Sequence, residues 1–316
     1  MRLLVTGGAG CLGSAIINHF AARSEKVVCF DNYATGDPRW IHESPTVELI
    51  RGDVRDDAAL DRVFRSFRPS HVVHAAATYA NPDDWVGDAE VNALGSLKVA
   101  QLSERMEVKQ LIYLQTALCY GRPEATPIPI SHPLQPATSY SISKVAGERY
   151  TLASGVPQAV SLRLANVCAP RLSIGPIPAF YQRIRSGKVS QISPAVRDFL
   201  DVSDFLALLE AVFNYSAEVR RAFNVSRGMG YSIEALFHKM EELMKKDGDY
   251  KRTDLAPDDV ESVVLDPQDT QEFFGWGAKT SFEDTLRNQI GWFEQFGTGA
   301  LRSHLRPRLE EEPDGG

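Results

Sequence analysis

The sequence contains few cysteines and no long apolar run, and these absences exclude several classes of protein. Four cysteines in 316 residues, without CxxC or Cys/His spacing, argue against a disulfide framework and predict no metal site. No uninterrupted apolar stretch approaches the roughly 20 residues that span a bilayer. The apolar run at the N-terminus is too short for the core of a signal peptide. We therefore expect a cytoplasmic protein with no membrane partner.

The chain also lacks a basic block, which excludes polyanionic partners. It has 34 Lys and Arg against 41 Asp and Glu, a net charge of −7. Such a chain is a poor candidate for binding nucleic acid or an anionic membrane. An anionic ligand would have to be held locally, by helix N-termini or single arginines. The 43% hydrophobic and 24% charged residues are typical of a soluble globular protein, and this length predicts about two domains.

Strand-like and helix-like segments alternate through the first half of the chain. The expected strands are residues 3–6, 26–31, 47–50, 71–77, 110–115 and 159–166. The expected helices between them are residues 12–22, 57–67, 84–106 and 137–153. This alternation predicts an α/β fold, a doubly wound parallel sheet with helices on both faces.

The second half is less regular. Residues 168–180, CAPRLSIGPIPAF, are rich in Pro, Gly and Ser and predict an ordered loop that encloses a ligand. Helical stretches follow near 203–213, 231–245 and 281–296. We expect a dinucleotide-binding domain of residues 1–165 plus about 199–226, and a smaller α+β substrate domain of about 166–198 and 227–305. The polar residues 306–316 are expected to form a flexible tail.

A glycine-rich turn follows the first expected strand and opens the first helix. It contains Gly7, Gly10 and Gly13, with Cys11 and Leu12 inside it. The glycines let the backbone approach a pyrophosphate, and the helix N-terminus supplies free N–H groups and partial positive charge. A glycine pattern alone also suits a plain strand-to-helix turn. The strand before it and the helix after it make this turn a predicted dinucleotide site.

Acidic residues after the next two strands indicate which dinucleotide binds. Asp31 ends the second strand 24 residues after the first glycine of the motif, close to the offset of a carboxylate that accepts the ribose hydroxyls. It would repel a 2′-phosphate, and Asn32 follows it instead of an arginine, so NAD is favoured over NADP. Asp53 and Val54 follow the third strand, where Asp53 either meets the adenine or caps the next helix.

Tyr140 and Lys144 lie four residues apart, on one face of an expected helix. A tyrosine is a feeble base at neutral pH. A nearby lysine and a positive nicotinamide would stabilise its phenolate, and lowering the pKa by about three units takes roughly 4 kcal/mol. Such a group suits proton exchange with an alcohol. Thr116 ends the preceding strand and could share that proton, although a lone threonine there is more often a turn residue.

These features together resemble a known family. The turn GGAGCLG, the carboxylate at Asp31, the segments GDV and HAAA, Thr116 and the Tyr140/Lys144 pair are similar to those of extended short-chain dehydrogenase/reductases that act on nucleotide-linked sugars. The resemblance covers about residues 1–300. It implies bound NAD, a catalytic Thr–Tyr–Lys set and a C-terminal nucleotide-sugar domain. It also implies a homodimer built from the helices near 84–106 and 140–153.

The resemblance further assigns roles to residues that spacing alone does not single out. The implied cofactor-lining residues are Ala75, Ala76, Ala77 and Asn92. Asn166 and Arg197 are implied to contact the phosphates of the substrate. Arg197 could otherwise be a surface ion-pair partner of Asp198 or Asp201.

Two more residues are candidates for the substrate side. Arg171 could bind a carboxylate or a phosphate, or could cap a loop. Asp259 could bind the uridine ribose. Its loop lacks the arginine that relatives carry there, which leaves the base of the nucleotide open.

The two residues after Thr116 favour one reaction within the family. Dehydratases of the family carry Asp-Glu there, and decarboxylases that act on UDP-glucuronate usually keep the glutamate, whereas this chain has Ala117 and Leu118. The resemblance then implies a 4-epimerase that inverts the 4-hydroxyl of a UDP-sugar through a transient 4-keto sugar, with NAD restored in each cycle. Tyr140 would take the proton and Lys144 would orient the cofactor.

Segments near Thr116 and after Asn166 resemble a subgroup that tailors uronic-acid nucleotides in bacterial O-antigen and moenomycin-type pathways. UDP-glucuronate and UDP-galacturonate are therefore the first expected substrates, and UDP-glucose and UDP-galactose the second. Two alternatives remain. One is a dehydratase or decarboxylase that uses a carboxylate from elsewhere in the fold, and the other is an NAD-sensing binding protein without catalysis.

Overall fold

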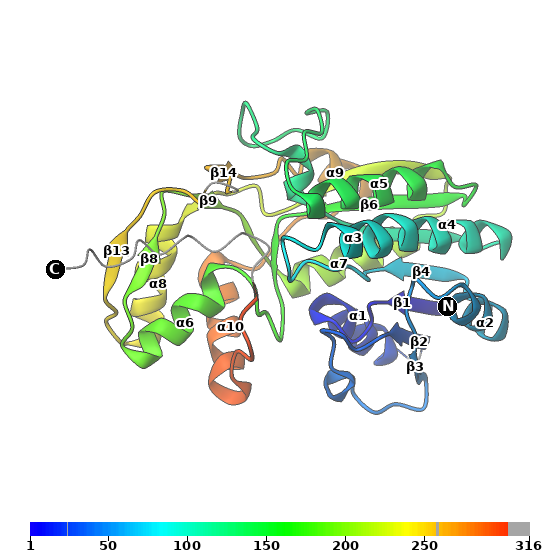
Figure 1. The fold of residues 1–316 in the computed structure, drawn as a ribbon, viewed down its shortest axis with the longest axis horizontal. Helices are drawn as coiled ribbons and strands as arrows, with labels where there is room; N and C mark the ends of the chain where they lie inside the picture. Colours follow the sequence, from blue (N-terminus) through cyan, green and yellow to red (C-terminus); the bar gives the residue numbers. More distant parts are fainter. Residues whose placement is uncertain (24, 257–258, 303–316) are drawn as a thin grey trace.

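A seven-stranded parallel sheet forms the centre of the computed structural model, which describes residues 1–302 except 24 and 257–258 (Figure 1). The strand order is β3-β2-β1-β4-β5-β6-β11. The strands are β1 (Arg2–Thr6), β2 (Lys26–Asp31), β3 (Val47–Arg51), β4 (His71–His74), β5 (Gln110–Thr116), β6 (Gln158–Leu164) and β11 (Val219–Val225). The predicted doubly wound α/β sheet is confirmed. The predicted tail at 306–316 lies outside the described residues.

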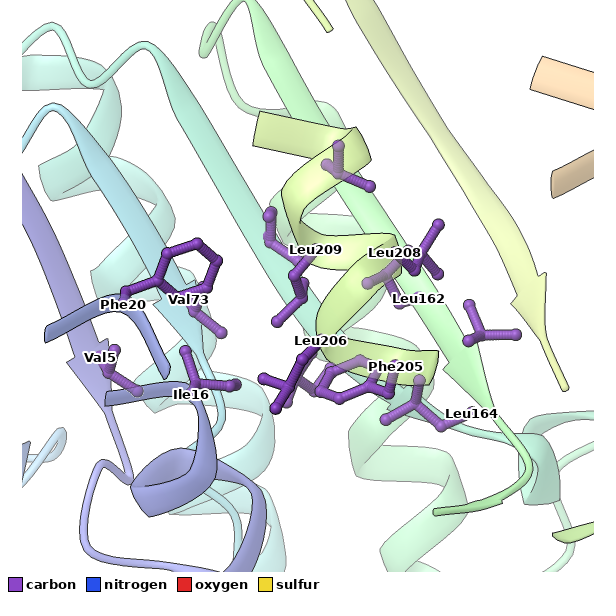
Figure 2. Packing of buried hydrophobic residues seen from close by; sticks show 14 of the residues in the cluster. Val5, Ile16, Phe20, Val73, Leu162, Leu164, Phe205, Leu206, Leu208 and Leu209 are labelled. Carbon is purple, nitrogen blue, oxygen red and sulfur yellow. The ribbon is translucent and has the colours of Figure 1, made fainter. Parts of the chain in front are cut away.

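Helices cover both faces of this sheet. They are α1 (Cys11–Ala21), α2 (Asp57–Phe67), α4 (Ser96–Arg105), α5 (Ser139–Ala153), α7 (Val202–Asn214) and α9 (Gln268–Phe274). Because successive side chains of a strand point to opposite faces, Val5 of β1 packs with α1 and α7, and Leu4 packs with α2 and α4. Figure 2 shows the first of these layers, in which Phe20 and Phe205 point toward the strands. These apolar layers on both faces of the sheet explain why its strands could be predicted from the sequence.

Two segments differ from the prediction. The expected helix at 84–106 is divided into α3 (Trp85–Asp88), a π-helical segment η2 (Ala89–Gly95) and α4. The expected loop at 168–180 contains the start of α6 (Pro176–Ser186). Proline lacks an N–H, and the first helical position does not need one, so a proline-rich segment can open a helix. Two short 3-10 helices, η1 (Pro38–Trp40) and η3 (Ala117–Tyr120), complete the sheet side.

The remaining elements form what we call the outer region, seen at the left of Figure 1. It comprises α6, α8 (Ile233–Met244), α10 (Phe282–Phe296), β7 (Asn166–Cys168), β8 (Ser190–Ile192), β9 (Val196–Arg197), β10 (Phe199–Asp201), β12 (Tyr231–Ser232), β13 (Tyr250–Arg252) and β14 (Ser262–Val263). Its three helices share an apolar core. We call the seven strands with their covering helices the sheet region. The two regions meet where the Trp40 ring lies 5.1 Å from that of Trp292 in α10.

Candidate active site

A cavity of about 440 Å³ is lined by residues at or just after the carboxyl ends of β1, β2, β3, β4, β5 and β6, together with residues of α5. This is the edge of a parallel sheet at which ligands bind. Of the predicted site residues, those lining the cavity are Gly7, Gly10, Cys11, Leu12, Gly13, Asp31, Asn32, Asp53, Val54, Ala75, Ala76, Ala77, Tyr140 and Lys144. The structure therefore gathers most of the predicted cofactor set at one place.

The glycine turn has the geometry that a pyrophosphate needs. Gly7 has a φ of +68°, and a Cβ at this position would lie 2.5 Å from the backbone nitrogen of Ala76. A Cβ at Gly13 would collide with the carbonyl oxygen of Gly7. The N-cap of α1, Gly10, has no side-chain cap, and the first turn has no acidic residue. The turn thus leaves helix N–H groups available to an anion, which fits a dinucleotide.

The carboxylate of Asp31 is built into the same turn. It accepts one hydrogen bond from the Ala9 backbone nitrogen at 3.0 Å and another from that of Tyr33 at 2.7 Å. A carboxylate can accept about four hydrogen bonds, so Asp31 keeps acceptor capacity for the hydroxyls of a ribose.

Asp53 lines the cavity and does not cap α2, because Asp56 has that role. Asp53 accepts from the Asn32 amide at 2.8 Å and from Arg55, also at 2.8 Å. The Arg55 guanidinium lowers the pKa of Asp53 to about 2. Arg55 lines the cavity and was missed by sequence reasoning. Its guanidinium is paired with Asp53 and Glu90.

Asn92 lies behind the cavity lining. It is fully buried in η2, where its amide accepts from the Thr78 backbone nitrogen at 2.9 Å and donates to the Thr78 carbonyl at 3.0 Å. It also donates to the Ser143 hydroxyl at 3.1 Å. These bonds hold the segment that follows Ala77 against α5. The structure thus places Asn92 behind the residues that line the cavity, where it supports them.

Lys144 is 2% exposed, and its amine contacts two neighbouring residues of β5. Its Nζ donates to the Leu114 carbonyl at 2.6 Å and lies 4.0 Å from the centre of the Tyr113 ring. Burial lowers the pKa of Lys144 to about 7. Burial also raises the pKa of Tyr140, and the nearby Tyr79 and Asp88 act in the same direction. The lowering expected for Tyr140 is therefore not a property of the protein by itself.

Thr116 lies where β5 ends and η3 begins. Its hydroxyl accepts from the Leu118 backbone nitrogen at 3.2 Å, which caps η3. The turn-residue role weighed for Thr116 is therefore real, and a second role in proton sharing remains a prediction. Ala117 is buried in η3, and η3 carries no carboxylate.

Four of the predicted substrate residues, Asn166, Arg171, Arg197 and Asp259, lie on the side of the outer region and do not line the cavity, whereas Tyr140 does. Arg197 of β9 and Asp259 form an ion pair, so two of these candidate contacts are partners of each other. Asp259, and neither Asp198 nor Asp201, is thus the acidic partner of Arg197. Asn166 begins β7, is exposed, and donates to the Asp198 carbonyl at 3.0 Å.

Arg171 connects the outer region to the glycine turn. It has a φ of +69°, and its guanidinium donates to the Ala9 carbonyl at 2.6 Å. Of the two roles considered for Arg171, the structure shows the contact with a loop, and that loop is the glycine turn. The Cys11 thiol donates to the Pro170 carbonyl at 3.2 Å. Leu172 and Ile174 then line the cavity, which is consistent with the expectation that this segment encloses a ligand.

Tyr79 and Gln115 are among the other lining residues that were missed from the sequence. Tyr79 lies with its ring 6.5 Å from that of Tyr140, and Gln115 precedes Thr116 on β5. The available signal was position, because Gln115 stands at the carboxyl end of β5 and Tyr79 in the loop that follows β4. Among the described residues, no cluster of His, Cys, Asp and Glu could hold a metal ion, and no helix is long and apolar enough to cross a membrane.

Comparisons with known proteins agree with this geometry. Residues 3–226 match the NAD dependent epimerase/dehydratase family. A crystal structure of the Bordetella bronchiseptica enzyme WbmG in complex with NAD and UDP is 46% identical, with a TM-score of 0.90, covering 97% of this chain and 98% of that one. A UDP-glucose 4-epimerase from Thermotoga maritima, solved with UDP-glucose, is 26% identical with a TM-score of 0.86, covering 93% of this chain and 99% of that one.

A curated relative, the UDP-glucose 4-epimerase of Bacillus subtilis, is 25% identical over 92% of this chain and 96% of its own length. The family description names NAD, the cofactor predicted from Asp31 and the glycine turn. Since the match covers well over half of the residues, the chain belongs to the NAD-dependent epimerase/dehydratase family.

Proposed function

We propose that the protein is a nucleotide-sugar 4-epimerase that inverts the 4-hydroxyl through a transient 4-keto sugar. One observation carries this proposal. Tyr140 and Lys144 share a cavity with the glycine turn, while η3 beside Thr116 offers only Ala117 and Leu118 where a dehydratase needs an acid and a base. The site is thus equipped for proton exchange at one hydroxyl.

The residues of the chain have distinct tasks in this reaction. Tyr140 accepts the proton of the 4-hydroxyl and later returns one, with the Thr116 hydroxyl in the same hydrogen-bond chain. Lys144 lies on α5 one turn after Tyr140, and the Leu114 carbonyl holds its amine. Bound NAD supplies the hydride acceptor and a positive charge that lowers the energy of the Tyr140 phenolate. That charge acts against the burial that raises the pKa of Tyr140.

We propose UDP-glucuronate and UDP-galacturonate as the first substrates to test, with UDP-glucose and UDP-galactose second. Support for the uridine nucleotide comes from WbmG, crystallised with NAD and UDP, and from the Thermotoga enzyme, crystallised with UDP-glucose. Support for a uronate comes from the resemblance of the segments near Thr116 and after Asn166. We assign phosphate binding to Arg197 and Asn166, and ribose binding to Asp259.

We also propose that the chain forms a homodimer. Five large apolar side chains are exposed on α3, η2 and α5, namely Trp85, Val86, Leu94, Ile142 and Tyr150. Trp85 is 61% exposed and Val86 70% exposed. These helices pack together on one face of the molecule. A second copy of the same face would remove the patch from water.

The reaction is tested by incubating the purified protein with each UDP-sugar in deuterated water and following the sugar by NMR. A 4-epimerase moves the same hydrogen away from carbon 4 and back, so the product should contain no carbon-bound deuterium. Deuterium at carbon 5 would indicate a dehydratase or a decarboxylase, and release of carbon dioxide would indicate the latter.

The Tyr140→Phe variant separates an enzyme from a binding protein. It removes the proton acceptor and keeps the ring, so turnover should fall by roughly 10²–10⁴-fold while NAD remains bound. Turnover at the wild-type rate would contradict the assignment of Tyr140. No turnover of any UDP-sugar by the wild-type protein would favour the NAD-sensing alternative.

A further inference from the structure

Three consecutive residues of β5 hold Lys144. The Tyr113 ring lies under its amine and the Leu114 carbonyl accepts from that amine, as described above. The third residue, Gln115, acts on the backbone. Its Nε2 donates to the Lys144 carbonyl at 2.8 Å.

The other end of the Gln115 side chain is also engaged. Its Oε1 accepts from the backbone nitrogen of Thr116 at 2.8 Å. One amide therefore joins the helix that carries Tyr140 and Lys144 to the residue that carries the third predicted catalytic hydroxyl. Gln115 is 2% exposed, and its bond to the Lys144 carbonyl is buried, where hydrogen bonds are strong and costly to leave unmade.

We propose that Gln115 is a positioning residue that sets the distance between Thr116 and the Tyr140/Lys144 pair. This inference rests on the proposed function for those three residues. It follows from geometry, because the Gln115 side chain bonds to both the Lys144 carbonyl and the Thr116 backbone nitrogen, whereas the Tyr113 hydroxyl donates to the Lys144 carbonyl alone, at 3.1 Å. A displacement of about 1 Å between reacting groups can cost about 10²-fold in rate.

The test compares Gln115→Met with a matched control on the same strand. Methionine keeps the length and loses both hydrogen bonds. Gln110 starts β5 and is 4% exposed, and its Nε2 donates to the Tyr215 carbonyl at 3.1 Å, far from the cavity. Gln110→Met removes a buried amide of the same kind and reports the purely structural effect. Both variants are prepared with NAD bound.

The first readout is kinetic. With the UDP-sugar that the wild type converts, kcat of Gln115→Met should fall roughly tenfold to hundredfold. KM and the affinity for NAD should change by less than about threefold. Gln110→Met should keep the wild-type kcat. An equal kcat in the two variants, or a loss of NAD affinity with unchanged kcat, would overturn the positioning role.

The second readout needs no substrate, so it separates this inference from the proposed function. Tyrosinate absorbance of the NAD-bound protein is titrated, and the part due to Tyr140 is isolated by subtracting Tyr140→Phe. A displacement of α5 should shift the pKa of Tyr140 by about one unit in Gln115→Met, and Gln110→Met should leave it unchanged. An unshifted titration in Gln115→Met would contradict the inference even if the protein epimerises sugars.

A third variant checks the hydrogen bond to the Lys144 carbonyl. In Gln115→Glu an ionised carboxylate cannot donate, whereas a protonated carboxyl of the same shape can. The kcat of Gln115→Glu relative to wild type should therefore recover as the pH is lowered. A ratio that does not vary with pH would argue against this bond as the cause.

Discussion

The sheet region and the outer region place their functional residues by different means. In the sheet region the positions follow from the backbone, since a parallel strand ends, a turn with positive φ follows, and the next helix begins. In the outer region they follow from side-chain contacts between distant parts of the chain. Arg197 pairs with Asp259, 62 residues away, and Arg171 bonds to Ala9, 162 residues away. We therefore expect NAD binding to be sensitive to backbone changes in the sheet region, and substrate binding to be sensitive to charge changes in the outer region.

The largest expected effect is at Gly7. In Gly7→Ala the new Cβ meets the Ala76 backbone at 2.5 Å, and the φ of +68° is unfavourable for alanine. The turn must shift, so NAD binding should weaken at least about a hundredfold, or roughly 3 kcal/mol. Isothermal titration with NAD measures this loss.

Gly187 provides the control for that prediction. It has a φ of +67° at the end of α6 in the outer region, and a Cβ there would meet nothing within 4 Å. Gly187→Ala should cost about 1 kcal/mol of stability and leave NAD affinity unchanged. A similar NAD affinity in both variants would show that the close approach to Ala76 does not matter.

The second expected effect concerns the Arg197–Asp259 pair. Arg197→Met removes the cation assigned to the substrate phosphates and leaves the partly buried Asp259 carboxylate unpaired. KM for the UDP-sugar should rise roughly tenfold to hundredfold, with NAD affinity unchanged. Steady-state kinetics and NAD titration on one preparation measure both.

Arg221→Met is the matched control, because Arg221 forms an ion pair with Asp269 away from the cavity. It should leave KM unchanged. If Arg197→Met lowered stability but kept the wild-type KM, the pair would be structural, and the phosphate role of Arg197 would be wrong.

The same contrast explains what could be predicted from the sequence. The glycine turn, Asp31 and the Tyr140/Lys144 pair are local patterns, because each is set by its own strand, turn or helix. The Gln115 bridge and the pairing of Arg197 with Asp259 depend on which segments meet in space, and no spacing along the chain encodes that. The π-helical segment around Asn92 was also hidden, because its composition suits an ordinary α-helix.

The smallest expected effect is a change in the free energy of unfolding, caused by Lys144 in the sheet region. Burial lowers the pKa of Lys144 from 10.5 to about 7, so the folded protein favours the neutral amine more than the unfolded chain does. The contribution of Lys144 to stability is therefore fully present above about pH 10.5 and is lost as the pH falls to about 7. Lys144→Met removes this dependence along with the amine.

Without NAD at pH 7, the free energy of unfolding of Lys144→Met should be about 1–2 kcal/mol higher than that of wild type. The gain is no larger because the variant also loses the hydrogen bond to Leu114. The advantage should shrink steadily toward pH 10, since the neutral amine carries no burial penalty. Urea unfolding at several pH values measures the difference. Lys98→Met, at a partly exposed lysine paired with Asp57, should give no such gain. If the difference in unfolding free energy between Lys144→Met and wild type stayed constant between pH 7 and 10, burial of the Lys144 charge would not be what destabilises the folded protein.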